Sequence, residues 1–266
     1  SVSAFLLNRS SDLAISGFKF SLFNCKTNVD GSVNMPFTKF DDASGISITI
    51  TNNVLGNNYA TFTTNADFWT QDAIGERLLV DNKQWIVSAV QDARVATVYI
   101  NGSYSVPGSP IYDWYESVFN EKRGWPSCVS FHQNRLIFGA TKSVPNCIWM
   151  SKVGDYTNFD VGTGLDDEAI YVTLLSAQHH QICTMVSSDN LQILTTQGEW
   201  AIANSPLTPS NVDIKQHTNI GCFYASYLPP QTIESRTVFI SQSGKDIREL
   251  DLDTLGEHYN AVDLYS

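Results

Sequence analysis

The chain has 266 residues, a formal net charge of −11, 42% hydrophobic residues and 16% charged residues. This composition provides enough apolar residues for a core and argues against a disordered chain. Residues 1–118 hold 7 basic and 11 acidic residues, and residues 119–266 hold 9 and 16, with no clustered Lys and Arg. The charge pattern therefore disfavours a tight, static nucleic-acid binder but leaves open an acidic wall past which DNA slides.

Alternation of apolar and polar residues predicts strands in the first 66 residues. The alternating runs are Phe18–Phe23, Ile46–Thr51 and Tyr59–Thr63, and Asn-rich turns separate them. Residues 67–75 are expected to form a short helical turn capped by Asp67.

Three further strands are predicted at residues 76–81, 84–91 and 96–100, joined by tight turns at Asp81-Asn82 and at 91–94. Gly and Pro residues then interrupt regular structure over residues 102–112. The sequence thus predicts a small β-barrel or β-sandwich domain over residues 1–118.

The second half repeats a three-strand meander. The first is expected at 129–132, 135–140 and 147–151, the second at 183–186, 191–195 and 199–202, and the third begins at 237–240 and 246–250. Their spacing of about fifty residues lies in the range of propeller blades. We therefore predict an all-β chain whose residues 119–266 form blades of an incomplete β-propeller. A closed propeller would need strands from the N-terminal region, from outside this sequence or from neighbouring subunits.

Candidate catalytic and metal-binding groups are few. Adjacent residues on a strand point to opposite faces, so His179 and His180 would not chelate one ion. His132 has no serine partner in a G-x-S-x-G nucleophile elbow, because the sequence contains no such motif. Asp166-Asp167-Glu168 is interpreted as a solvated acidic loop rather than a metal or acid–base cluster. The lysines are isolated and no Gly-rich phosphate loop is present, so the sequence does not indicate a nucleotide site. Three tryptophans in or beside strands are expected to pack inside the blades: Trp125, Trp149 and Trp200. The sequence predicts no enzyme, no metal and no cofactor.

Five cysteines, an odd number with no C-x-x-C spacing, are expected to be free thiols: Cys25, Cys128, Cys147, Cys183 and Cys222. No apolar stretch reaches transmembrane length, and the first residues lack the features of a signal peptide. Because the sequence starts without Met and stops abruptly, we expect it to be a piece of a longer protein.

A series of motifs from residue 123 onward occurs in a fixed order. They are Arg123-Gly124-Trp125-Pro126, Phe131-His132, Asn134-Arg135-Leu136, Phe138-Gly139, Ile148-Trp149, Ser151-Lys152, Gly154-Asp155-Tyr156, Asn158-Phe159, Gly198-Glu199-Trp200, the run Pro206 to Val212, Ser243-Gly244-Lys245 and Arg248-Glu249-Leu250. In order and spacing this series resembles the tail tubular protein B, tail nozzle, hub or phage stabilisation family of short-tailed bacteriophages. The resemblance covers Trp69 to the C-terminus and only weakly the first sixty residues.

The resemblance implies a structural virion protein of the phage tail, assembled in the host cytoplasm. It implies a homo-oligomeric ring, a hexamer, that contacts portal, adaptor and other tail proteins and through which double-stranded DNA is ejected. Five acidic residues without an intervening Lys or Arg are then candidates for a loop that faces the channel: Asp155, Asp160, Asp166, Asp167 and Glu168. The neighbouring acidic stretch, residues 251–257, is a second candidate.

Two alternatives from other functional classes remain at this stage. A carbohydrate-binding or receptor-binding β-propeller at the tail tip would show an exposed aromatic platform with Asp or Asn nearby. A glycan hydrolase would show two opposed carboxylates in a cleft.

Overall fold

The computed structural model describes residues 23–52, 58–176, 179–223, 229–233, 236–252 and 259–264. Over these residues the chain is built of antiparallel β-strands with two short 3-10 turns, so the predicted all-β class is confirmed. The strand expected at Phe18–Phe23 lies almost entirely outside the described residues, as does most of the second acidic stretch. The chain divides into two compact units, one of residues 25–125 and one that contains Phe23, Asn24 and the chain from Pro126 onward.

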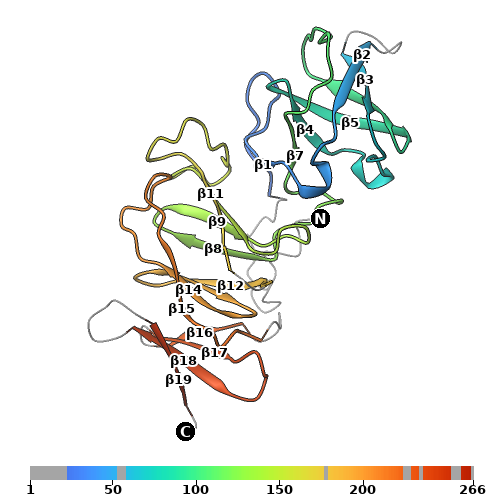
Figure 1. Ribbon diagram of the computed structural model, residues 1–266. Coiled ribbons are helices and arrows are strands. Elements are labelled where there is room, and N and C mark those ends of the chain that lie inside the picture. The colour runs from blue at the N-terminus through green and yellow to red at the C-terminus, as the bar shows by residue number, and fades with distance from the viewer. Residues whose placement is uncertain are drawn as a thin grey trace, which may run out of the picture. The chain divides into compact units, whose positions relative to one another are not determined.

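The unit of residues 25–125 contains a curled seven-stranded sheet in the order β1-β7-β4-β5-β6-β3-β2 (Figure 1). Its strands are β1 (Phe37–Thr38), β2 (Ile48–Asn52), β3 (Tyr59–Thr64), β4 (Arg77–Val80), β5 (Lys83–Asp92), β6 (Val95–Ile100) and β7 (Trp114–Ser117). The strands expected from alternation are present within a few residues of their predicted bounds. The sequence did not indicate that β7 returns to this sheet, where it pairs with both β4 and β1.

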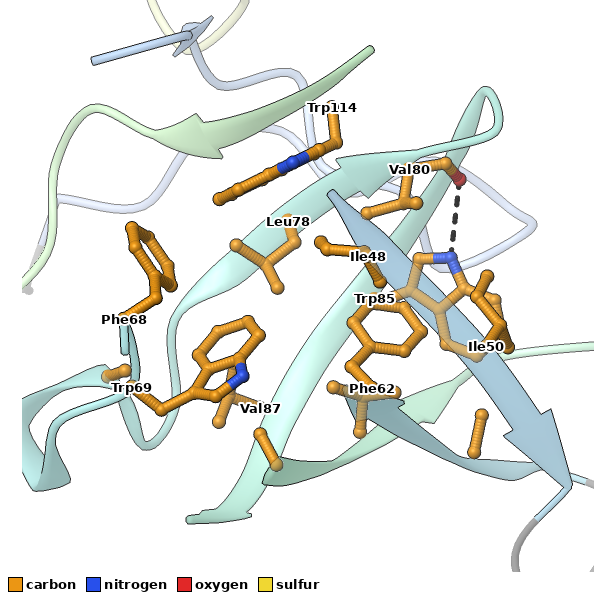
Figure 2. Packing of buried hydrophobic residues seen from close by; sticks show 14 of the residues in the cluster. Ile48, Ile50, Phe62, Phe68, Trp69, Leu78, Val80, Trp85, Val87 and Trp114 are labelled. Atoms are coloured by element: carbon orange, nitrogen blue, oxygen red, sulfur yellow. Dashed lines mark hydrogen bonds between the residues drawn. The ribbon is translucent and has the colours of Figure 1, made fainter. Parts of the chain in front are cut away.

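One face of this sheet encloses an aromatic core. Phe62, Trp85 and Trp114 are fully buried among aliphatic side chains. The rings of Phe62 and Trp85 pack together with centroids 5.0 Å apart, and Trp114 packs against Phe68 at 5.1 Å (Figure 2). The indole N–H of Trp85 donates to the carbonyl of Val80 at 3.3 Å, so burial leaves that donor paired. Because every second residue of each strand points inward, the alternating pattern alone fixes which residues meet here.

Two hairpin turns were predicted correctly from their side chains. Asp81 and Asn82 both have positive φ, 53° and 56°, and so do Gln133 and Asn134, at 45° and 57°. Two consecutive left-handed residues form the turn whose twist matches paired strands, and Asn and Asp tolerate that conformation. The helical turn was predicted less well. The 3-10 turn η4 covers Gln71–Ala73, and Asp67 does not cap it but forms an ion pair with Arg94.

Three four-stranded antiparallel blades follow (Figure 1). Blade 1 contains β8 (Cys128–His132), β9 (Arg135–Gly139), β10 (Cys147–Met150) and β11 (Ile170–Thr173). Blade 2 contains β12 (Ile182–Ser187), β13 (Leu191–Thr195), β14 (Gly198–Ile202) and β15 (Ile214–Thr218). Blade 3 contains β16 (Gln231–Ile233), β17 (Arg236–Ile240), β18 (Ile247–Leu252) and β19 (Tyr259–Asp263). The predicted propeller-like repeat is therefore confirmed.

The blades pack face to face through apolar side chains. Ile137 and Ile148 of blade 1 share a cluster with Ile193 and Trp200 of blade 2, and Leu194 of blade 2 shares another with blade 3. The middle strands β9, β10, β13 and β14 are buried along their whole length, which explains their nearly continuous apolar sequences. Between blades, Thr237 also donates a hydrogen bond to the buried amide of Gln192 at 2.6 Å.

The first compact unit extends past the boundary expected near residue 118 and ends at Trp125. Arg123 binds Asp42 through two hydrogen bonds and the buried Glu116 through two more. Lys122 pairs with the same Glu116 at 3.1 Å. These ion pairs hold Lys122 and Arg123 against the seven-stranded sheet, and the contact with Asp42 spans 81 residues of sequence.

Candidate functional site

The β8–β9 turn contacts two long loops. One connects β10 to β11 and comprises residues 151–169; we call it the acidic loop. The other connects β14 to β15 and comprises residues 203–213. Both loops carry motifs of the series found in the sequence, and the turn between them carries a third.

Arg135 joins the acidic loop to the 203–213 loop. Its side chain is completely buried, and its guanidinium donates to the carbonyls of Ser151 at 2.8 Å, Glu168 at 2.6 Å and Asp166 at 2.9 Å. It also donates to the carbonyl of Leu207 at 3.3 Å. Burial lowers the pKa of Arg135, and the charge of Asp167 opposes that shift. The planar fork of Arg suits this arrangement, in which one side chain holds backbone from three segments.

The side chain of Gln133 also binds the backbone of the 203–213 loop. Its amide nitrogen donates to the carbonyl of Asn204 at 2.7 Å, and its carbonyl accepts from the backbone N–H of Leu207 at 2.7 Å. On the other side of the turn, the backbone N–H of Gly154 donates to the carbonyl of Asn134 at 2.9 Å. The β8–β9 turn thus fixes the conformation of both loops.

Glu168 closes the acidic loop on itself. Its carboxylate accepts hydrogen bonds from the backbone N–H groups of Thr163, Gly164 and Leu165 at 2.6–2.8 Å. These bonds, with that of Leu165 first, lower the pKa of Glu168. Gly162 is required next to it, because its φ is 53° and a Cβ there would lie 2.1 Å from Glu168 Oε1. This carboxylate is therefore part of the loop's framework.

The structure brings the five predicted acidic residues into one loop but gives them different roles. Glu168 is engaged as described, and Asp167 forms an ion pair with Lys152 at 2.8 Å that lowers its pKa. Asp155 is half-buried and accepts from the hydroxyl of Thr157 at 3.1 Å. Asp160 and Asp166 are exposed, and Asp160 accepts only from the backbone N–H of Gly162 in the same loop. The outward negative charge is therefore carried mainly by Asp160 and Asp166.

An exposed aromatic pair lies beside this loop. Phe131 of β8 is 56% exposed and Tyr156 is 42% exposed, and their ring centroids are 5.3 Å apart in an edge-to-face arrangement. Asn134 and Asp155 are close to them in sequence. Trp149 and Trp200 are buried in the blades as expected. Trp125, which was expected to pack there too, belongs to the unit of residues 25–125 and is only half-buried.

The structure places a serine next to His132. His132 Nδ1 lies 2.9 Å from Ser187 Oγ, a contact between blades 1 and 2 that no sequence pattern indicated. The amide of Gln133, oriented by Leu207 and Asn204, places its N–H group 3.3 Å from His132 Nε2. That ring nitrogen is then the acceptor, so Nδ1 carries the proton and donates to Ser187. Burial lowers the pKa of His132, which favours this neutral form.

A histidine that donates to a serine cannot remove the serine's proton, so this pair joins the blades rather than activating a nucleophile. His180 is buried and stacks on Trp200 with centroids 5.6 Å apart, whereas His179 is exposed, so the two do not share one side. Across the residues that the structure describes, no group of three or more His, Cys, Asp or Glu is placed to hold a metal ion.

Comparisons with known proteins do not identify a family or a function for this chain. No family model and no curated protein matches the chain. Among solved structures, it is similar to dihydro-heme d1 dehydrogenase NirN in complex with DHE, with 12% identity and a TM-score of 0.37. The match covers 91% of this chain and 48% of that one, so the chain spans about half the length of that protein. A match at this level carries no argument about function.

No helix in the described part of the chain has the length and apolar character needed to span a membrane.

Proposed function

We propose that this chain is a structural protein of a short-tailed bacteriophage tail, part of a nozzle or hub ring through which DNA is ejected. The proposal is supported mainly by the hydrogen bonds of Arg135, which connect three of the sequence motifs. The motif that contains Arg135 binds the carbonyl of Ser151, which begins a second motif, and the carbonyl of Leu207, which lies in a third. The motifs in which the chain resembles the tail family thus hold two loops in fixed conformations, which supports a structural role.

The proposed role in DNA passage rests on Asp160 and Asp166. Both are exposed on a loop whose backbone is fixed by Arg135 and Glu168. Carboxylates within about 10 Å of DNA repel its phosphates at roughly 0.1 M salt. A ring multiplies this small repulsion by the number of subunits, which would keep the duplex from adhering to the wall.

The absence of enzymatic activity is part of the proposal. It is supported by the proton position at His132, which does not suit Ser187 as a nucleophile. It is also supported by the use of Glu168 and Asp167 as framework and ion-pair groups rather than as opposed carboxylates.

The test is genome ejection by particles that carry Asp160→Lys and Asp166→Lys together. We expect these particles to assemble normally and to eject DNA more slowly, because the loop then attracts phosphate. Asp189→Lys is the matched control, since Asp189 is an exposed aspartate in the β12–β13 turn. Normal ejection at low salt by the double variant would contradict the channel-facing role.

A second candidate is a receptor-binding or carbohydrate-binding module, which the exposed Phe131–Tyr156 pair favours. Aromatic rings with neighbouring Asn and Asp side chains are typical of sugar-binding surfaces. Phe131→Ala and Tyr156→Ala would then abolish binding to cell-surface polysaccharide. Absence of any polysaccharide binding by the unchanged protein would remove this candidate.

A further inference from the structure

The third blade has one covered face and one open face. Thr237, Phe239, Leu250 and Tyr259 are buried and face blade 2. Adjacent residues of a strand point to opposite sides, so Val238, Ile240 and Glu249 point away from blade 2. In the sheet register Val238 pairs with Glu249, Glu249 with Val262, and Ile240 with Ile247.

We call this second side the open face. It consists of Arg236, Val238, Ile240, Ile247, Glu249 and Val262, with Asp251 beside Arg236. Val262 is 51% exposed, and the remaining apolar members are half-buried. Arg236 pairs with Glu249 at 2.5 Å and with Asp251 at 3.5 Å, so the face carries one cation and two anions. It is apolar with an excess of one negative charge.

The outward side of blade 1 is aromatic and uncharged, and Phe131 and Tyr171 are exposed on it. Phe138 is buried there beneath Phe23 and Phe159, with ring centroids 5.2 and 5.3 Å away. Trp149 is buried and stacks on Tyr171. None of the outward residues in the strands of blade 1 is charged, so the excess negative charge of the open face favours a cationic surface elsewhere as its partner.

The seven-stranded sheet offers a surface of the complementary kind. On its outer side the register places Arg77, Ile86, Tyr99 and Tyr59 in one row across four strands. Arg77 is half-buried, and its side chain forms no ion pair or hydrogen bond with another residue in the described ranges. Burial lowers the pKa of Arg77, as expected for a cation that lacks a counter-ion. We call this row the Arg77 row.

We propose that the open face of one copy packs against the Arg77 row of a neighbouring copy. The excess carboxylate of the open face would pair with Arg77, and Val238 and Val262 would cover Ile86 and Tyr99. Apolar residues around a few paired charges are the usual make-up of interfaces between separately folded chains. Since the two surfaces differ, the contact is heterologous and generates a ring when its rotation closes. This inference rests on the ring-forming role proposed above.

The test is a charge exchange followed by analytical ultracentrifugation. Val262 pairs with Glu249 in the sheet register, so Val262→Lys places a second cation near Arg77, and Arg77→Glu places an anion near the carboxylates. Each change alone should weaken self-association at least about tenfold. The double variant pairs the new Lys with the new Glu and should recover most of the loss, because the two sites are coupled only if they touch.

Val153→Lys is the control, because Val153 is 40% exposed and belongs to neither surface. It should associate like the unchanged protein, and circular dichroism should show that all variants are folded. A protein that stays monomeric at every concentration would overturn the contact, as would single variants that associate normally or a double variant that is not rescued. Since ejection is measured on particles, failure here would leave the proposed tail function standing.

Discussion

Arg135 and Leu207 are joined by a hydrogen bond of 3.3 Å although 72 residues separate them. Arg135 lies in the second strand of blade 1, and Leu207 lies in the loop between the last two strands of blade 2. The bond therefore connects two blades at the same point where Arg135 also holds the acidic loop. Arg135 thus acts with Gln133 and Glu168 to fix the conformation of the candidate site.

Arg135→Lys should destabilise the unit that contains the blades. Lysine cannot make the forked contacts with four carbonyls, and some of those buried acceptors would be left unpaired. We expect a loss of roughly 2–4 kcal/mol in unfolding free energy, measured by urea denaturation. Faster amide exchange should appear in residues 163–168 and 205–208. Lys142→Met, at an exposed position, should change neither quantity.

Glu168→Gln should loosen the acidic loop without unfolding the blade. A neutral amide is a weaker acceptor for the N–H groups of Thr163, Gly164 and Leu165 than the carboxylate that now binds them. Hydrogen exchange of these three amides should accelerate, while exchange in β9 and β10 stays unchanged. Because these bonds lower the pKa of Glu168, the same three amides of the unchanged protein should lose protection, relative to their intrinsic exchange rates at each pH, as the pH falls through that lowered value. Unchanged exchange in the variant would show that the carboxylate does not order the loop.

Glu76 should make stability fall as pH rises. It is buried beside Glu116, and burial first, then the charge of Glu116, raises the pKa of Glu76 to about 9. The positive charges of Lys122 and Arg123 are paired with the carboxylates of Glu116 and Asp42. Glu76 has no such ion pair with the described residues, so it is the carboxyl that stays protonated. Between the unfolded pKa of about 4.3 and this raised value, the folded protein holds a proton that the unfolded chain releases.

The unfolding free energy should therefore decline with increasing pH across that window, by up to about 1.4 kcal/mol per pH unit, and level off above about pH 9. Glu76→Gln should remove this component, because a glutamine carries no titrating proton. The measurement is urea unfolding from about pH 6 to about pH 10, with amide exchange of β4 and β7 as the local readout. Glu121→Gln, at an exposed carboxyl in the same unit, should retain the slope. An identical pH profile for Glu76→Gln and the unchanged protein would contradict the assignment.

All five cysteines are free thiols in the structure, as expected from the sequence. Burial raises the pKa of Cys25 and of Cys128 to about 12, so thiolate is scarce at neutral pH. We expect very slow alkylation of Cys128 in the folded protein and five alkylated cysteines after denaturation without reductant. Mass spectrometry of the two samples provides the check, and a disulfide-linked peptide in the second would contradict it.

The sequence predicted the hairpin turns and the inner strands, because short-range residue preferences and side-chain alternation determine them. Asp81-Asn82 tolerates the left-handed turn conformation, and residues 191–195 were placed at the bounds that β13 has in the structure. The last strand of blade 2 and the first strand of blade 3 were missed because Ile214–Thr218 and Gln231–Ile233 are largely polar or exposed and lack apolar alternation. The register of the inner strands, by contrast, follows directly from side-chain period.

The candidate site was predicted only in part. The acidic residues are visible in the sequence, but whether a carboxylate is paired depends on partners such as Lys152 and the backbone of residues 163–165. The contact of His132 with Ser187 spans 55 residues, and no spacing rule connects them. One signal was available for Arg135, a charged residue within the apolar run of β9, since a buried charge requires partners.

The central claim is that this chain belongs to a tail ring with its acidic loop along the path of DNA. The most direct measurement is a cryo-electron microscopy map of the intact virus particle that contains this protein. We predict a ring of copies in the tail, with Asp160 and Asp166 within about 10 Å of the axial DNA density, the range over which they act on phosphate at roughly 0.1 M salt. A map in which the acidic loop lies on the outer surface, or in which the tail does not contain this chain, would contradict the account.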